Sequence, residues 1–120
     1  MYVDGFVLAV PEDRVGDYRK IAEDAAAVWI EHGALAYHEC LADDVPYGEL
    51  TSFPRAVQAK DGEQVVFAWI TYPSREARDA VNARVMADPR MKLGQPDMPF
   101  DMKRMIFGGF RSLVSRERPS

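Results

Sequence analysis

Residues 64–72 constrain the fold most, because their side chains are apolar in both of the alternating sets that a strand presents. In a sheet with one face in water, apolar and polar residues alternate along each strand. Residues 2–10 share the apolar character of residues 64–72. The two sets of the later strand are Val66, Ala68 and Ile70, and Val65, Phe67 and Trp69. We therefore expect a sheet that is covered on both faces.

The order of the remaining elements predicts how this sheet is built. The strand over residues 2–10 ends at Pro11, and apolar residues three or four apart then predict a helix that Gly33 ends. Ser74 is a good N-cap for a second helix, which ends before Pro89. Further strands are predicted over residues 34–42, 64–72 and 103–114. This order predicts an α+β, ferredoxin-like βαββαβ fold, an antiparallel sheet with two helices on one face.

Length and charge limit the function further. A chain of 120 residues fits one domain, which we place at residues 1–120. The net charge of −4 argues against binding nucleic acid, which needs clustered cations. The chain has neither a basic, apolar leader nor an apolar run long enough to cross a membrane, and Cys40 has no disulfide partner. We expect a cytoplasmic protein.

The apolar sets also predict self-association. Glycine and alanine let a helix approach closely, so we expect Gly5 and Ala9 to face the helices. The residues then left on the open face are Phe6, Leu8, Tyr37, Leu41, Phe67, Trp69 and Phe107. Such a surface is an aggregation liability unless it is covered, and a second copy related by a two-fold axis is the simplest cover. The sequence predicts a homodimer.

Three segments carry a resemblance to a known family: TSFPRAVQAKDGEQVVFAWITYPS, VMADPRM and MPFDMKRMIFGGF. They resemble the YbaA-like family of small bacterial proteins, described as domain of unknown function 1428, and the resemblance runs over nearly the whole chain. This family is placed with the dimeric alpha-beta barrels, whose other branches include cofactor-free monooxygenases, isomerases and haem-degrading enzymes. The resemblance implies a fold and a dimer, and it implies no activity or catalytic residue.

Ionisable residues among the aromatic ones on the predicted open face are the candidates for chemistry. Asp4, Glu39 and Arg111 would enter the space between the two sheets of a dimer. A buried carboxylate must be paired, hydrogen-bonded or neutral. Glu39 or Asp4 near Arg111 is therefore either an ion pair that fixes the dimer or an acid/base group, with Glu39 as the candidate catalytic residue.

The long connection over residues 43–63 contributes further candidates. Phe53 and Arg55 could lie over the sheet edge as a lid, with Arg55 binding a carboxylate or phosphate; the alternative is an arm that packs on the other subunit. Together with Tyr37, Trp69 and Arg111 these residues form the predicted ligand site.

Three smaller features have simpler interpretations. His38 and Cys40 point the same way on one strand but lack a third ligand, so we favour packing in the core and predict neither metal nor cofactor. Adjacent glycines, Gly108 and Gly109, indicate a bulge or a close backbone approach, of which the bulge is the commoner. Five methionines gather around the irregular residues 87–101 and suit either gap filling or an adaptable binding surface, of which we favour gap filling.

Two functions are compatible with these features. The first is a small-molecule-binding protein or cofactor-free enzyme with a pocket beside the sheet, near Glu39, Tyr37, Phe53 and Trp69. The second is a non-catalytic dimeric module that regulates or scaffolds another protein, which predicts a filled interior.

Overall fold

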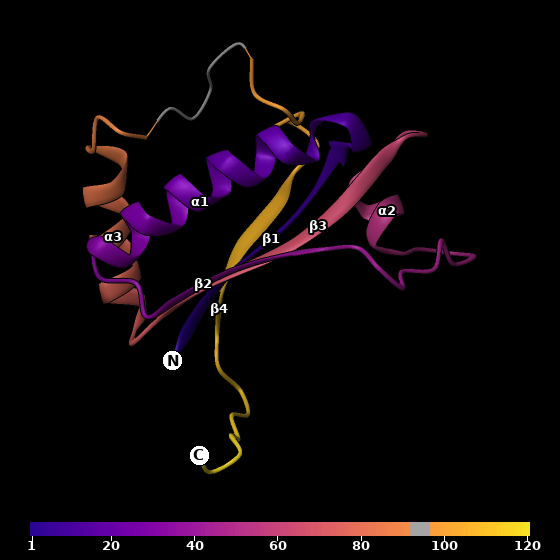
Figure 1. Cartoon of the computed structure of the whole chain (residues 1–120). Helices are drawn as coiled ribbons and strands as arrows, with labels where there is room; N and C mark the ends of the chain where they lie inside the picture. Colours follow the sequence, from indigo (N-terminus) through magenta and orange to yellow (C-terminus); the bar gives the residue numbers. More distant parts are fainter. Residues whose placement is uncertain (92–96) are drawn as a thin grey trace.

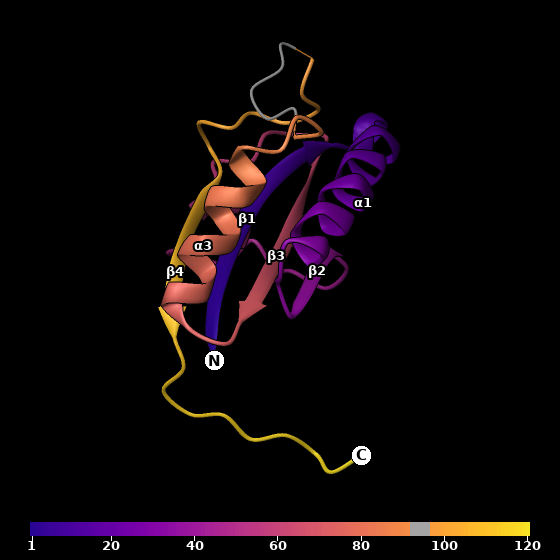
Figure 2. The ribbon, with the colours of Figure 1, turned by 90° about the vertical axis from the view of Figure 1, so that its left-hand side faces the viewer.

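The chain was analysed as a computed structural model, which describes residues 1–91 and 97–120. Within these residues, four antiparallel strands form one sheet in the order β2-β3-β1-β4. The strands are β1 (Tyr2–Pro11), β2 (Ala36–Leu41), β3 (Glu63–Tyr72) and β4 (Ile106–Arg111). Two helices, α1 (Val15–Glu31) and α3 (Arg75–Met86), lie side by side on one face (Figure 2). The predicted α+β, ferredoxin-like arrangement is confirmed.

Residues at the ends of α1 and α3 determine where the two helices begin and end. A single 3-10 turn, Glu12–Arg14, leads from β1 into α1. Gly33 follows α1 with a φ of 116°, a left-handed conformation that favours glycine. The Ser74 hydroxyl accepts a hydrogen bond of 3.1 Å from the amide of Ala77 and so caps α3.

Strand pairing decides which residues face the helices. Directly opposed residues of antiparallel strands share a face, and Phe6 is opposite both Ala68 of β3 and Phe107 of β4. The helix-facing set of β1 packs against the helices, because Tyr2 and Phe6 join the cluster of Trp29. This set consists of Tyr2, Asp4, Phe6, Leu8 and Val10. We call the opposite side the outer face.

The predicted orientation of β1 and β2 is therefore wrong. Gly5 and Ala9 lie on the outer face, whereas Phe6, Leu8, Tyr37 and Leu41 lie on the helix side. Phe67 and Trp69 do lie on the outer face, as expected. The small residues toward the sheet are on α1 instead, where Ala22 and Ala25 line the same space as Phe6, Leu8 and Tyr37.

The outer face is covered at one end only. A short helix, α2 (Phe53–Ala56), lies on this side of the sheet, away from α1 and α3 (Figure 1). Val57, which follows α2 and is 1% exposed, packs against Val7, Ala9 and Val65. The rest of the outer face is open in the single chain.

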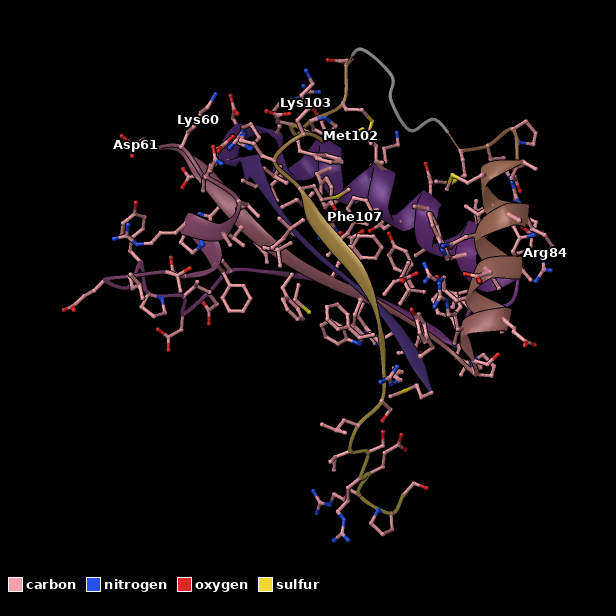
Figure 3. The ribbon with its side chains drawn as sticks, turned by 180° about the vertical axis from the view of Figure 1, so that it is seen from behind. Lys60, Asp61, Arg84, Met102, Lys103 and Phe107 are labelled. Carbon is pink, nitrogen blue, oxygen red and sulfur yellow. The ribbon has the colours of Figure 1, made fainter. Side chains whose placement is uncertain are left out.

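Strand β4 is shorter than the predicted 103–114, because its ladder needs β1 as a partner. The pairing runs from Val7 with Ile106 to Tyr2 with Arg111, where β1 begins. Beyond it, residues 112–120 extend away from the sheet, as Figures 1 and 3 show, and Leu113 is 96% exposed. The expected bulge at Gly108 and Gly109 is absent, since the pairing continues through both without an extra residue.

Candidate functional site

Glu39 is the centre of the candidate site. It lies on β2 with its side chain toward α1, and its Oε2 atom accepts a 2.7 Å hydrogen bond from the Tyr37 hydroxyl. Its Oε1 atom accepts a hydrogen bond from the hydroxyl of Tyr18, which α1 contributes. Tyr37 and Glu39 share a side because they are two apart on one strand. Two phenol groups from different elements thus fix both carboxylate oxygens.

Aromatic rings extend the site on either side of Glu39. The ring of Tyr18 meets Phe100 edge to face, with centroids 5.6 Å apart. On the other side, the centroids of Tyr37 and Trp29 are 5.9 Å apart. The indole nitrogen of Trp29 donates a 3.1 Å hydrogen bond to the hydroxyl of Tyr72. The tyrosines are therefore held by ring packing as well as by Glu39.

A cavity of about 130 Å³ lies between α1 and the sheet, beside the Glu39 carboxylate. It is lined by Phe6, Leu8, Tyr18, Ile21, Ala22, Ala25, Trp29, Tyr37, Glu39, Ala68, Ile70, Met91, Met98, Phe100, Met102 and Met105. A more open groove of about 470 Å³ lies alongside and shares Tyr18, Ala22, Tyr37 and Glu39 with the cavity. Glu39 and its tyrosines therefore lie where the open groove meets the smaller cavity.

Electrostatics keep the two phenols protonated. Burial, followed by the negative charge of Glu39, raises the pKa of Tyr18 and of Tyr37 far above the ordinary value of 10.0. Both hydroxyls therefore remain hydrogen-bond donors at neutral pH. Of the residues that the structure describes, none with a cationic side chain lines the cavity. Arg19 lines the groove, but its Nε atom is 3.1 Å from Oε1 of Glu23.

Asp4 belongs to a separate cluster on the helix side and is not paired with Arg111. Its Oδ1 atom is 3.5 Å from Nη1 of Arg78, which α3 places above it. Nη2 of Arg78 also donates a 3.0 Å hydrogen bond to the Tyr2 hydroxyl. Burial raises the pKa of Asp4 above its ordinary value of 3.8. Arg111 is exposed at the end of β4, and within the described part of the single chain neither Asp4 nor Glu39 forms a salt bridge with it.

The other predicted ligand-binding residues lie away from Glu39. Trp69 is on the outer face, and its ring is 5.5 Å from that of Phe67, which in turn meets Phe53 at 5.7 Å. Arg55 holds its own loop: its Nε and Nη2 atoms donate 3.0 Å hydrogen bonds to the backbone oxygens of Tyr47 and Gly48. The predicted site thus divides into Glu39 with Tyr37 on one face and an aromatic group on the other.

His38 and Cys40, the two potential metal ligands on β2, lie on the outer face. His38 packs its ring 4.9 Å from Trp69, and Cys40 is exposed, so packing of Cys40 in the core is wrong for the single chain. Within residues 1–91 and 97–120 no group of three or more His, Cys, Asp or Glu side chains could hold a metal ion.

A hollow of about 570 Å³ runs along the outer face. Gly5, which is directly opposite Gly108 in the sheet, is one of the residues that line it. Its other lining residues are Val3, Phe6, Val7, Phe67, Trp69, Ile106, Phe107 and Phe110. This hollow, which we call the apolar trough, has no charged side chain among the residues that line it.

Sequence reasoning missed Tyr18 and Phe100. Tyr18 lies among the apolar residues of α1 that face the sheet. A buried tyrosine hydroxyl usually has a hydrogen-bond partner, and this was the one feature of the sequence that indicated a polar group opposite Tyr18. Four of the five methionines, Met91, Met98, Met102 and Met105, line the cavity, whereas Met86 is exposed. Residues 92–96 of this irregular segment lie outside the described residues.

The sheet order and its two covering helices define an α+β domain with a ferredoxin-like fold. A solved structure with this fold is the crystal structure of an uncharacterized NIPSNAP domain protein from Burkholderia xenovorans. The likeness has a TM-score of 0.59 and 16% identity, and it covers 98% of this chain and 100% of that one. At this identity the comparison shows the fold alone.

Sequence comparison identifies the family. A family profile with the description "Protein of unknown function (DUF1428)" matches residues 1–102. Uncharacterized protein YbaA of Escherichia coli strain K12 is 56% identical over 113 residues, which are 94% of this chain and 97% of that protein. The protein of the same name in Shigella flexneri has the same identity and coverage. The chain belongs to the DUF1428 family.

Proposed function

We propose that this protein binds a small molecule in the cavity beside Glu39. The observation that carries the proposal is the Glu39 carboxylate, which two phenols hold where an open groove meets a smaller, largely apolar cavity. Ligand sites combine mostly apolar walls with a few fixed polar groups, and this arrangement has both. A filled interior, as a purely scaffolding module would have, leaves no such space.

In this proposal Glu39 contacts the ligand directly. A carboxylate within hydrogen-bond reach of a ligand can take or return a proton, so Glu39 is also the group through which the protein would catalyse a reaction. Tyr18 and Tyr37 orient it, because each donates to a different carboxylate oxygen. Trp69, Phe53, Arg55 and Arg111 have no part in this site, since they lie on the outer face, in α2 or at the end of β4.

The protein acts as a homodimer in the same proposal, with the apolar trough covered by a second copy. Phe67 and Phe110 are 43% and 63% exposed in the single chain. A trough without charged lining residues favours a partner with an equally apolar surface, and a second copy supplies one. We expect the dimer to bury at least about 1,000 Å² in total.

Replacement of each of two alanines on α1 by leucine tests the proposed site. Ala22 lines the cavity and the groove, whereas Ala27 is exposed on the same helix. Ala22→Leu should fill the space, and Ala27→Leu makes the same change in side-chain volume where nothing is enclosed. The measurement is a chemical-shift titration with n-butanol, a small neutral probe.

Binding by the wild type and by Ala27→Leu, with loss in Ala22→Leu, is the expected result. If neither n-butanol nor the corresponding cation, n-butylammonium, perturbs a residue around Glu39 in the wild type, the cavity does not admit ligands. The scaffolding function would then be the better description.

A further inference from the structure

We propose that the ligand of the Glu39 cavity is a small organic cation, a protonated amine or a quaternary ammonium group. This inference rests on the proposed function and adds the chemical class of the ligand. Three observations support it: the charge of the site, the identity of its walls and its size.

Among the described residues that line the cavity, one side chain is a carboxylate and none is a cation. Glu39 is the sole ionisable acid among its described lining residues, and none of the described lining residues is Lys, Arg or His. The two tyrosines supply hydrogen bonds but no charge, because their raised pKa values keep them neutral. Arg19 in the adjoining groove is engaged with Glu23. A carboxylate in an apolar setting is costly unless a cation accompanies it, and a ligand can bring that cation.

The walls suit an organic cation rather than a hydrated metal ion. Five aromatic residues line the cavity: Phe6, Tyr18, Trp29, Tyr37 and Phe100. Aromatic faces attract ammonium groups, with Trp the most effective, and several rings around one site form the cage known from quaternary ammonium recognition. The thioethers of the lining methionines adapt to the alkyl part of a ligand. A metal ion would need further carboxylate, imidazole or thiolate ligands, and Glu39 is the one such group in the described lining.

The volume limits the ligand to a small one. A dry cavity of about 150 Å³ in an engineered protein holds benzene. The 130 Å³ beside Glu39 therefore suits a short alkylamine or a compact ammonium ion. The groove next to it offers a route for a polar substituent to reach solvent.

A matched pair of probes tests the inference with the folded wild-type protein. The n-butylammonium ion and n-butanol have the same chain length and differ in the charged head group. Calorimetry or chemical-shift titration at neutral pH gives the dissociation constant of each. We expect the cation to bind at least about tenfold more tightly, the combined effect of the carboxylate and the aromatic walls.

Glu39→Gln keeps the shape of the side chain and removes its charge, so it should bring the two affinities within about twofold. Glu117→Gln, in the exposed C-terminal segment, removes the same charge away from the cavity and should keep the preference. If Glu39→Gln fails to fold, the residues that n-butylammonium perturbs in the wild type decide the question, because binding elsewhere on the protein leaves the chemical shifts around Glu39 unchanged.

The outcomes separate the two proposals. If n-butanol binds the wild type as tightly as the cation does, the cavity is a ligand site but the inference is wrong. If the cation preference persists in Glu39→Gln, it arises elsewhere on this acidic protein and the inference is equally wrong. If neither probe binds, the proposed function itself fails.

Discussion

Gly109 of β4 lies where Tyr2 and Arg78 meet, and a side chain has no room there. A Cβ atom on Gly109 would overlap the Tyr2 hydroxyl and come within 2.8 Å of Nη2 of Arg78. The neighbouring Gly108 has more space, because a Cβ atom there would approach only the ring of Phe110, at 3.7 Å. Gly109, but not Gly108, is therefore required by its contacts.

Gly109→Ala should destabilise the protein by about 1–3 kcal/mol, because the new methyl group displaces Tyr2 and with it the contact of Arg78 with Asp4. Gly108→Ala is the matched control and should change the free energy of unfolding by less than about 0.5 kcal/mol. Urea denaturation of both variants and the wild type measures the difference. If both variants lost the same free energy of unfolding, the contact of Gly109 with Tyr2 and Arg78 would not be the reason for a glycine at this position.

At the residue scale, the sequence predicted neighbours along a strand but not partners across the fold. Alternation on β2 correctly placed Tyr37 and Glu39 on one side. It could not show which side faces the helices, and so neither Tyr18 above Glu39 nor Arg78 above Asp4 could be predicted. Those contacts depend on how the helices lie across the sheet.

Arg104 ties three segments together at one end of the sheet. Its Nη1 and Nη2 atoms are each 2.8 Å from a different oxygen of Glu63, at the start of β3. Nη1 also donates to the backbone oxygen of Gln58, and Nε donates to Asp101. In Figure 3 the adjacent Lys103 lies near this end of the sheet, with Lys60. Arg104 thus fixes the approach to β4 against the beginning of β3.

Arg104→Gln should lower the free energy of unfolding by about 1–3 kcal/mol, because it removes paired, charge-assisted hydrogen bonds. Those bonds hold the pKa of Glu63 below its ordinary value of 4.5. Their contribution is therefore complete above about pH 4.5 and is lost as the pH falls through the lower folded-state pKa. Thermal melts across pH 2–7 should show the two proteins converging in acid.

The control for this prediction is Arg19→Gln, which removes an exposed pair with Glu23 on α1. We expect it to cost no more than about 0.5 kcal/mol. A constant gap between wild type and Arg104→Gln down to the lowest pH would contradict the role given to Glu63.

At the element scale, residue spacing predicted the type and order of the strands and long helices. It did not predict which sheet face each strand residue occupies or where each element ends. The spacing of apolar residues predicted α1, and the Ser74 cap predicted α3. The end of β4 could not be read locally, because it depends on where β1 begins. The short helix α2 was missed since its four residues are too few to show a helical period.

The proposed dimer makes the whole molecule sensitive to one charge on the outer face. Trp69→Glu places a carboxylate in the apolar trough and should weaken association by more than about 2 kcal/mol, so that monomers predominate at micromolar concentration. Arg118→Glu, in the C-terminal segment, also introduces a negative charge and should leave association unchanged. Analytical ultracentrifugation measures both; a wild-type monomer at micromolar concentration would rule out the dimer.

The position of β2 in the sheet gives the Glu39 cavity a wall that can move. Strand β2 pairs with β3 alone, so its other edge has backbone groups without a strand partner. Local opening in proteins begins where few neighbours must be released, and edge strands open more readily than central ones. If β2 opens first, Tyr37 and Glu39 would move outward together while β1 and β3 stay paired. The proposed ligand would then exchange with solvent without unfolding of the core.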